Sequence, residues 1–114
     1  MPAYLVVRVT NMSDPTAYGE YVKHTPRILE KFGGRFIARG GETVTLEGPD
    51  DGARIVLIEF DSVEDAKAMY NSPEYQAAKA IREGAGDAHF VVTEGYPDAT
   101  WQESLAASKQ LTLD

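Results

Sequence analysis

The chain has 114 residues, of which 43% are hydrophobic and 25% charged, a composition typical of one globular domain. Its net charge is −7 and its basic residues are scattered, which argues against binding to nucleic acid or to an anionic membrane. Cysteine is absent, which excludes disulfides, thiolate nucleophiles and zinc–thiolate sites. Because there is no membrane-spanning apolar run and no signal-peptide pattern, a cytoplasmic location is expected.

The first predicted strand covers residues 4–10, whose side chains alternate between two faces. A helix is predicted to follow, with Asp14 as its N-cap and Pro15 as its first residue. Its apolar face repeats at helical spacing and consists of Tyr18, Tyr21, Val22, Thr25, Ile28, Leu29 and Phe32. Pro26 is expected to kink this helix at residues 22–23, because the proline ring displaces the hydrogen bond to the carbonyl four residues earlier.

A second strand is predicted at residues 35–39, after Gly33-Gly34 ends the helix. Gly40-Gly41 indicates a bulge or bend, after which residues 42–47 either continue the strand or begin a hairpin arm. Residues 48–52 are expected to form an exposed turn.

The central part of the chain has the clearest pattern. The apolar run at residues 55–60 predicts a strand covered on both faces. Two helical segments are predicted next, capped by Ser62 and Ser72, with Pro73 as the first residue of the second. The last strand is predicted at residues 90–93.

This order of elements over residues 1–95 predicts an α+β, ferredoxin-like β-α-β-β-α-β domain with an antiparallel sheet. Right-handed crossovers place both helices on one face of the sheet. The other face is expected to carry one of two apolar sets. These are Leu5, Val7, Val9, Ile55 and Leu57, or Val6, Val56, Ile58 and Phe60. A patch of that size is too large for a stable monomer, so a homodimer that packs sheet to sheet is expected.

Residues 96–114 follow this domain as a tail, in which a short helix is predicted at residues 100–110. Such a helix is marginal alone, yet the tail carries Trp101, the single tryptophan of the chain. We expect the tail to turn away at Pro97 and to lay Trp101 and Leu105 on the dimer partner or over the mouth of its pocket. The alternative is a frayed terminus.

Several spaced motifs together resemble a known family. They are Tyr18-x-x-Tyr21, Gly33-Gly34-Arg35, Arg39-Gly40-Gly41, Glu59-Phe60, Ala66-x-x-x-Tyr70-x-Ser72-x-x-Tyr75 and Arg82. Over residues 3–95 this pattern resembles domain-of-unknown-function family 1330, of the dimeric α/β-barrel superfamily. The resemblance implies a ferredoxin-like fold and a homodimer whose two sheets form a barrel, and it implies no established activity. The wider superfamily includes cofactor-independent and haem-degrading monooxygenases, lactone isomerases and dehydratases, so the fold alone selects no reaction.

Two residues are candidates for catalysis, His24 and Arg39. His24 follows Tyr21 by three residues and is either an acid, base or haem ligand or a partly exposed helical histidine. Arg39 stands at the glycine bend, where it either binds a carboxylate or oxyanion or forms a salt bridge. The salt-bridge candidates are Glu42, Glu47 and Glu59. His89, in the last strand, is interpreted as a surface or edge residue.

The candidate pocket residues are Tyr18, Tyr21, Glu59, Tyr70 and Tyr75. The tyrosines are on helix faces expected to pack on the sheet, where they either fill the core or line an apolar pocket with converging hydroxyls. Glu59 interrupts an apolar strand, and if buried it needs a partner such as Arg8 or Arg39. Arg82, near a helix C-terminus, fits stabilisation of the helix dipole.

Metal-ligand spacing and nucleotide-binding motifs are absent from the sequence, so neither a metal nor a nucleotide cofactor is expected. Three functions remain open. One is an enzyme for a cofactor-independent acid–base or oxygenase reaction on a small, partly apolar molecule. A non-catalytic dimeric module that binds a small ligand explains the same residues. A haem-degrading monooxygenase requires His24 or His89 to face an open apolar cavity.

Overall fold

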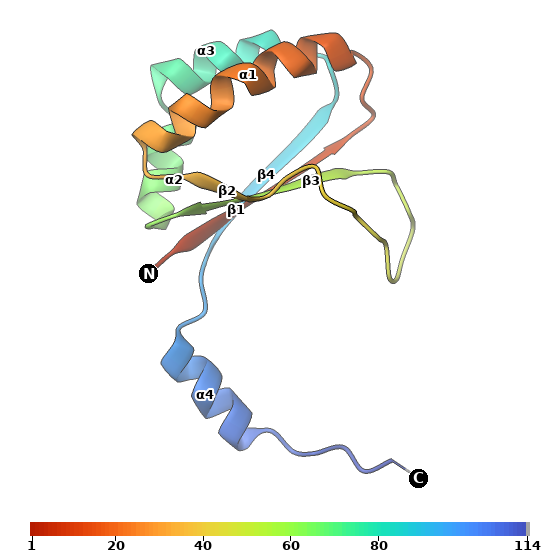
Figure 1. Cartoon of the computed structure of the whole chain (residues 1–114), viewed down its shortest axis with the longest axis vertical. Coiled ribbons are helices and arrows are strands. Elements are labelled where there is room, and N and C mark those ends of the chain that lie inside the picture. The colour runs from red at the N-terminus through yellow and green to blue at the C-terminus, as the bar shows by residue number, and fades with distance from the viewer. Residues whose placement is uncertain (114) are drawn as a thin grey trace.

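The computed structural model describes residues 1–113. Its elements in chain order are β1 (Ala3–Thr10), α1 (Pro15–Lys31), β2 (Arg35–Ala38), β3 (Arg54–Phe60), α2 (Val63–Tyr70), α3 (Pro73–Ile81), β4 (Asp87–Glu94) and α4 (Asp98–Ala107). The strands form one antiparallel sheet in the order β2-β3-β1-β4. Helices α1, α2 and α3 cover one face, the other face is open, and α4 stands away from the body (Figure 1). This is the predicted ferredoxin-like arrangement.

The two central strands, β1 and β3, supply most of the sheet's contribution to the core. Their buried side chains are Ala3, Leu5, Val7, Val9, Val56, Ile58 and Phe60. Val7 lies directly opposite Val56, and opposite residues of an antiparallel pair point to the same side. The predicted grouping of the two strands was therefore wrong. Val6, not Val7, shares a face with Ile55 and Leu57.

The open face of the sheet is mixed in character. Its apolar side chains are Val6, Ile55, Leu57 and Val91, and its polar ones include Tyr4, Arg8, Glu59, His89 and Thr93. Leu57, Val6 and Val91 form one row across three neighbouring strands. β4 pairs with β1 along its whole length, from Ala3 opposite Glu94 onward. The apolar patch is therefore a central row flanked by polar side chains.

The helices over the sheet begin where the sequence predicts. The side chains of Asp14, Ser62 and Ser72 accept hydrogen bonds from backbone N–H groups three residues later, at 3.0, 3.0 and 3.1 Å. Each cap satisfies a donor that the first helical turn leaves unpaired. These local bonds fix where α1, α2 and α3 start over the sheet.

α1 runs as one helix through Pro26, and the kink expected at residues 22–23 stays a prediction. Pro26 has no N–H and leaves the carbonyl of Val22 without its helical donor. The hydroxyl of Thr25 donates to that carbonyl at 3.0 Å instead. A side chain thus replaces the missing backbone hydrogen bond and keeps the helix continuous.

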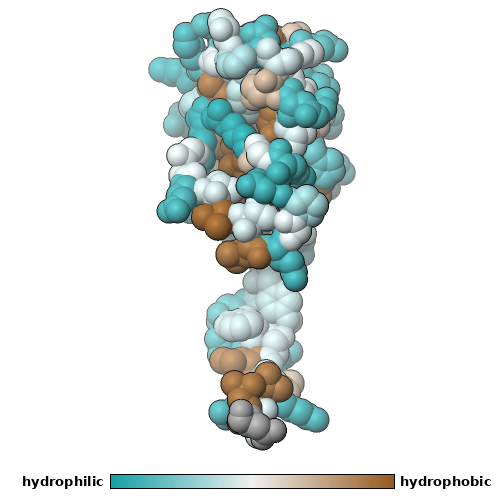
Figure 2. All heavy atoms as spheres, turned by 90° about the vertical axis from the view of Figure 1, so that its right-hand side faces the viewer, coloured by the Kyte–Doolittle hydropathy of each residue, from teal (hydrophilic) through white to brown (hydrophobic). Residues whose placement is uncertain are grey.

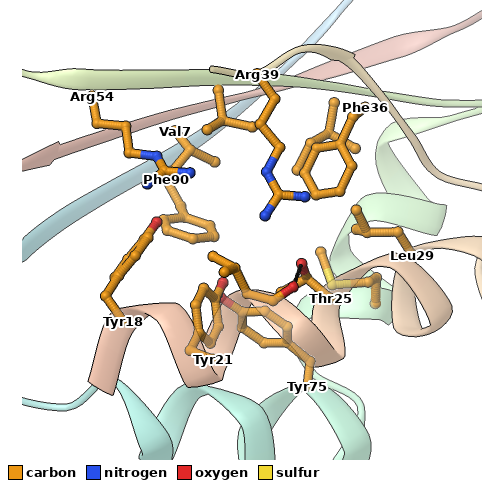
Figure 3. A pocket seen from close by; sticks show the side chains of 14 residues that line it. Val7, Tyr18, Tyr21, Thr25, Leu29, Phe36, Arg39, Arg54, Tyr75 and Phe90 are labelled. Carbon is orange, nitrogen blue, oxygen red and sulfur yellow. Dashed lines mark hydrogen bonds between the residues drawn. The ribbon is translucent and has the colours of Figure 1, made fainter. Parts of the chain in front are cut away.

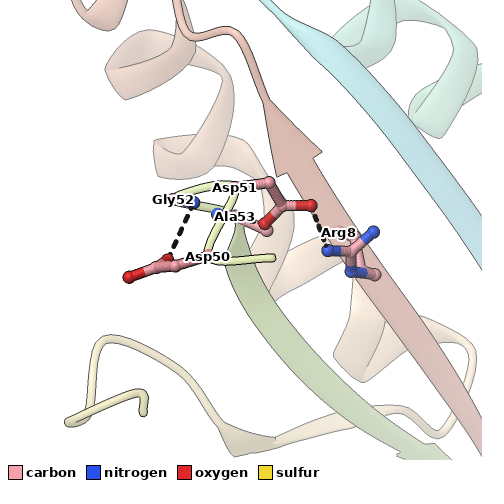
Figure 4. A network of polar contacts seen from close by, with 5 residues as sticks. All are labelled: Arg8, Asp50, Asp51, Gly52 and Ala53. Carbon is pink, nitrogen blue, oxygen red and sulfur yellow. Dashed lines mark hydrogen bonds and ion pairs between the residues drawn. The ribbon is translucent and has the colours of Figure 1, made fainter. Parts of the chain in front are cut away.

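Residues 39–53 form an exposed loop between β2 and β3. The prediction that residues 42–47 continue the strand or start a hairpin arm was wrong, and the bend at Gly40, with a φ of 71°, ends the extended chain. The far end of the loop is fastened to β1, because Arg8 Nη2 lies 2.7 Å from Asp51 Oδ2 (Figure 4). The loop is therefore held to β1 as well as to β2 and β3, the two strands that it joins.

α4 begins and ends slightly before the helix that the sequence predicts. None of its residues is buried, and Trp101 and Leu105 are 53% and 55% exposed. Figure 2 shows this segment as a protrusion from the body that carries apolar side chains. Within residues 1–113, no helix combines the length and apolar character needed to span a membrane.

Candidate small-molecule cavity

A cavity lies between the sheet and helices α1 and α3 (Figure 3). Its walls are mostly apolar and aromatic side chains, and the polar residues among them are Tyr18, Tyr21, Thr25, Arg39, Arg54 and Tyr75. The space between the walls is about 410 Å³ when the open mouth is counted, but the part that a water-sized molecule can occupy is only about 30 Å³. That part has room for a water molecule or two. A larger ligand therefore enters only if a side chain at the mouth moves.

The floor of the cavity holds a pair of buried tyrosines. The hydroxyls of Tyr21 and Tyr75 lie 2.8 Å apart, and Arg82 Nη2 donates to the Tyr75 oxygen at 3.1 Å. The mutual bond uses one of the two hydroxyl protons, whichever tyrosine donates it. The other proton remains available to donate to a ligand in the cavity.

Two phenols of the cavity, those of Tyr21 and Tyr18, stay neutral at physiological pH. Burial, reinforced by the neighbouring Tyr75, raises the pKa of Tyr21 well above its ordinary value of 10.0. Burial also raises the pKa of Tyr18, although Arg54 and Arg82 oppose the shift. Both tyrosines therefore keep their protons, so they can donate a hydrogen bond but do not act as bases.

Two arginines stand at the mouth. Arg39 lies over the ring of Phe36 at 4.3 Å and extends into the cavity, and Arg54 lies over the ring of Tyr18 at 5.3 Å (Figure 3). Within residues 1–113 neither guanidinium forms an ion pair. Among these residues no aspartate, glutamate or histidine lines the cavity. The site is consequently cationic in a protein whose net charge is −7.

Arg82 supports the floor from behind. It is 9% exposed, and its guanidinium lies over the rings of Tyr21 and Phe90 at 5.0 and 5.1 Å. Its Nε has no hydrogen-bond partner among the described residues. Aromatic faces and one phenol oxygen thus surround a buried cation, where a carboxylate is the usual partner.

The structure brings four of the predicted site residues together, Tyr18, Tyr21, Tyr75 and Arg39. It does not bring His24 to them. His24 is exposed and lines a groove on the outer side of α1 and α3.

Three further residues of interest lie elsewhere. Glu59 is on the open face of the sheet and pairs with Arg35 at 3.0 Å, rather than with Arg8 or Arg39. Tyr70 lines a separate groove beside β4. His89 is opposite Arg8 on the open face, so neither histidine reaches the cavity and its residues do not fit a haem site. Within residues 1–113 no cluster of three or more His, Asp or Glu side chains is placed to hold a metal ion.

Sequence reasoning missed Arg54 as a cavity residue and gave Arg82 only a role in stabilising the helix dipole. One signal was available for Arg54. Arg39 and Arg54 immediately flank the segment that joins two antiparallel neighbouring strands, so both must emerge at the same end of the sheet. The position of Arg82 depends on how α3 packs against α1, which the local sequence does not specify.

The family described as Domain of unknown function (DUF1330) matches residues 2–96 of the chain. The chain belongs to this family. The match spans the whole sheet with α1, α2 and α3, and it stops before α4. The cavity therefore lies inside the residues that match DUF1330, whereas α4 lies outside them.

Solved structures similar to this DUF1330 chain share its fold at low sequence identity. A protein of unknown function from Rhodopseudomonas palustris is 22% identical, with a TM-score of 0.68 over 84% of this chain and 83% of that one. SnoaB, a cofactor-independent oxygenase from Streptomyces nogalater, is 11% identical, with a TM-score of 0.60 over 84% of this chain and 94% of that one. An ethyl tert-butyl ether D (EthD) family protein from Bacillus halodurans is 13% identical, with a TM-score of 0.54 over 84% and 100%. No match was found among curated proteins.

Proposed function

We propose that the cavity binds a small organic anion with an apolar body. The observation that carries this proposal is the pair Arg39 and Arg54, two cations at the mouth without an ion-pair partner within residues 1–113. A guanidinium fork matches the geometry of a carboxylate. The leftover hydroxyl proton of Tyr21 and Tyr75 suits a second oxygen on the same ligand.

Entry of the ligand involves the loop of residues 39–53. The part of the cavity that a water-sized molecule can occupy is too small for an acid the size of benzoate, and Arg39 over Phe36 lines it. Arg39 directly follows β2 and belongs to the exposed loop, so it can swing without disturbing the sheet. When an anion binds Arg39 and Arg54, both guanidinium groups leave the aromatic rings that they contact. They form charged hydrogen bonds to the anion instead.

A second candidate function is catalysis on the same ligand. Neutral phenol donors and arginines stabilise an enolate or phenolate relative to its protonated form. SnoaB, which has the same fold, is a cofactor-independent oxygenase. No carboxylate or histidine among the described residues lines the cavity to act as a base, so the substrate must itself be acidic enough to ionise. Such substrates are phenols or enolisable acids with a depressed pKa.

Binding is tested with a panel of small acids, including benzoate, 4-hydroxybenzoate and phenylpyruvate, by calorimetry and thermal shift. Arg39→Met should weaken the best binder about 10- to 100-fold, the loss typical of a hydrogen bond to a charged group. Arg35→Met is the matched control, because Arg35 faces the other side of the sheet and pairs with Glu59. Equal binding by Arg39→Met and by the unmodified protein contradicts the proposal.

Catalysis is tested on the acids that bind, by recording oxygen uptake and the ligand absorbance. Turnover that falls in Tyr21→Phe while binding persists supports the enzyme. Saturable binding of every tested acid without uptake or spectral change supports a non-catalytic binding module.

We also infer that two copies pack open face to open face. The central row of Val6, Leu57 and Val91 supplies the apolar contact, and the flanking polar residues supply a rim. Leu57→Asp should shift the mass measured by light scattering from dimer to monomer. Val44→Asp is the control, since Val44 is 63% exposed in the loop. A monomeric mass for the unmodified protein contradicts this assembly.

A further inference from the structure

A second groove, here called the β4 groove, runs between β4 and helices α2 and α3. Its cationic residues are Lys67, Lys79 and Arg82, and its apolar surface comes from Tyr70, Phe90 and Val92. No aspartate or glutamate among residues 1–113 lines it, although Glu64 lies 3.5 Å from Lys67 at its rim. The β4 groove therefore suits an occupant that is both apolar and acidic.

Arg82 is a buried cation in this groove that lacks a carboxylate partner among the described residues. The side chain is about nine-tenths buried, donates to Tyr75 through Nη2, and has an Nε without a hydrogen-bond partner among the described residues. Within residues 1–113 no carboxylate lies within ion-pair distance of it. Burying an uncompensated charge is expensive in free energy, so a carboxylate arriving beside Arg82 is favourable.

The chain itself carries a segment with the complementary chemistry. α4 is a ten-residue helix without a buried residue, and a helix of this length is marginal when isolated. Trp101 and Leu105 are four residues apart and share one side of the helix, and Asp98 precedes Trp101 by three on that side. Glu103 is two residues from both Trp101 and Leu105 and lies on the opposite side of the helix. The side of α4 that carries Trp101 and Leu105 is thus apolar with one acidic residue, Asp98, at its N-terminal end.

We propose that α4 of one copy docks in the β4 groove of a second copy. Trp101 and Leu105 cover Tyr70, Phe90 and Val92, while Asp98, on the same side of α4, approaches the cations of the groove. The proposal rests on the two-copy assembly proposed above.

The path of the chain favours a second copy over the chain's own groove. The N–H of Gly95 donates to the carbonyl of Pro2 at 2.7 Å and holds the end of β4 against the N-terminus. Only Tyr96 and Pro97 separate that point from α4, and α4 lies beyond the end of the sheet (Figure 1). An arm that leaves the body in this direction presents its apolar side to a neighbouring molecule.

The single tryptophan makes the first measurement direct. Docking predicts that Trp101 in the unmodified protein emits at a shorter wavelength than free indole in water and is poorly quenched by acrylamide. Emission like that of free indole, with full quenching, overturns the proposal. A buried Trp101 in a protein whose mass is monomeric also overturns it, because α4 then docks on its own chain.

Charge reversal identifies the groove. One variant carries Lys67→Glu and Lys79→Glu, the other Asp98→Lys, and circular dichroism checks that both fold. Each variant alone pairs like charges and should show a red-shifted, quenchable Trp101.

Mixing the two variants separates docking in trans from docking in cis. In a mixed dimer, each α4 meets a groove of opposite charge, so the blue-shifted emission should return. Within one chain, the charges stay mismatched and mixing changes nothing. If the emission does not return while light scattering shows mixed dimers, docking in the β4 groove is refuted and the sheet-to-sheet dimer stands. If the mass is monomeric, the assembly itself has failed.

Discussion

The hydroxyls of Tyr21 and Tyr75 lie 2.8 Å apart and tie α1 to α3 across 54 residues of sequence. The two rings meet edge to face, with their planes at 80°. Only Tyr75 also accepts from Arg82, at 3.1 Å. The two hydroxyls are therefore unequal. Removal of the Tyr21 hydroxyl leaves one group, the Tyr75 hydroxyl, without its partner. Removal of the Tyr75 hydroxyl leaves two groups, the Tyr21 hydroxyl and Arg82 Nη2, without theirs.

Tyr75→Phe should destabilise the protein more than Tyr21→Phe. Loss of the Tyr75 hydroxyl leaves Arg82 Nη2 and the Tyr21 hydroxyl unpaired in a buried site, at about 1–3 kcal/mol. Loss of the Tyr21 hydroxyl removes one hydrogen bond and costs about 0.5–1.5 kcal/mol. Urea unfolding of both single variants and the double variant measures the coupling. Equal losses in the two single variants would contradict the arrangement.

Stability should fall steeply in alkali. The unfolded chain releases the Tyr21 proton near the ordinary pKa of 10.0, whereas the folded protein has a raised pKa and keeps it. Below about pH 10 both states hold the proton, so this group does not change the free energy of unfolding. Above about pH 10 only the unfolded state releases it, so the free energy of unfolding falls as the pH rises. The free energy of unfolding of Tyr21→Phe should decline less between about pH 9 and about pH 11. Parallel profiles for the two proteins would argue against the raised pKa.

Thr25→Val should destabilise α1 because Pro26 lies next to it. The variant keeps the shape of the side chain but leaves the carbonyl of Val22 without a donor, at about 1–3 kcal/mol. Thr25→Ser retains the hydroxyl and should lose less. In a Pro26→Ala background the backbone N–H returns, so Thr25→Val should cost little there. An unchanged cost in that background would show that the hydroxyl matters for another reason.

Gly34→Ala should strain the junction of α1 and β2. A Cβ at this position would lie 2.6 Å from the ring of Phe60, which is fully buried and cannot move aside freely. Overpacking of this kind typically costs about 1–3 kcal/mol. Gly41→Ala is the matched control, because a Cβ there meets no atom within 4 Å. Thermal unfolding that is the same for both variants would contradict the prediction.

The order of elements was predictable because its signals are local. Three helix starts are marked by N-cap hydrogen bonds made within one turn, from the side chains of Asp14, Ser62 and Ser72. The relative phase of two strands is not local: β1 and β3 each alternate, but only their register decides whether Val7 faces Val56 or Ile55. Residues 42–47 alternate as a strand would, yet they lie in the loop, because alternation alone does not supply a neighbouring strand.

The candidate site was predictable in its tyrosines and only partly in its charges. Tyr18, Tyr21 and Tyr75 follow the inward face of their helices. His24 is on the same helix as Tyr21, but Thr25 takes the inward position and His24 turns to solvent. Arg39, Arg54 and Arg82 come together because the loop between β2 and β3 brings the chain back to the same end of the sheet and because α3 packs on α1. No single segment of the sequence specifies either arrangement.

Ala3 lies opposite Glu94, so the chain of the body returns to the place where it began. A short linker between these two ends, with a new opening inside the exposed loop of residues 39–53, should yield a circular permutant that keeps every strand pairing. α4 follows this point, so its removal or replacement should leave the strand pairings of the body unchanged. The family match ends close to the same point, at residue 96.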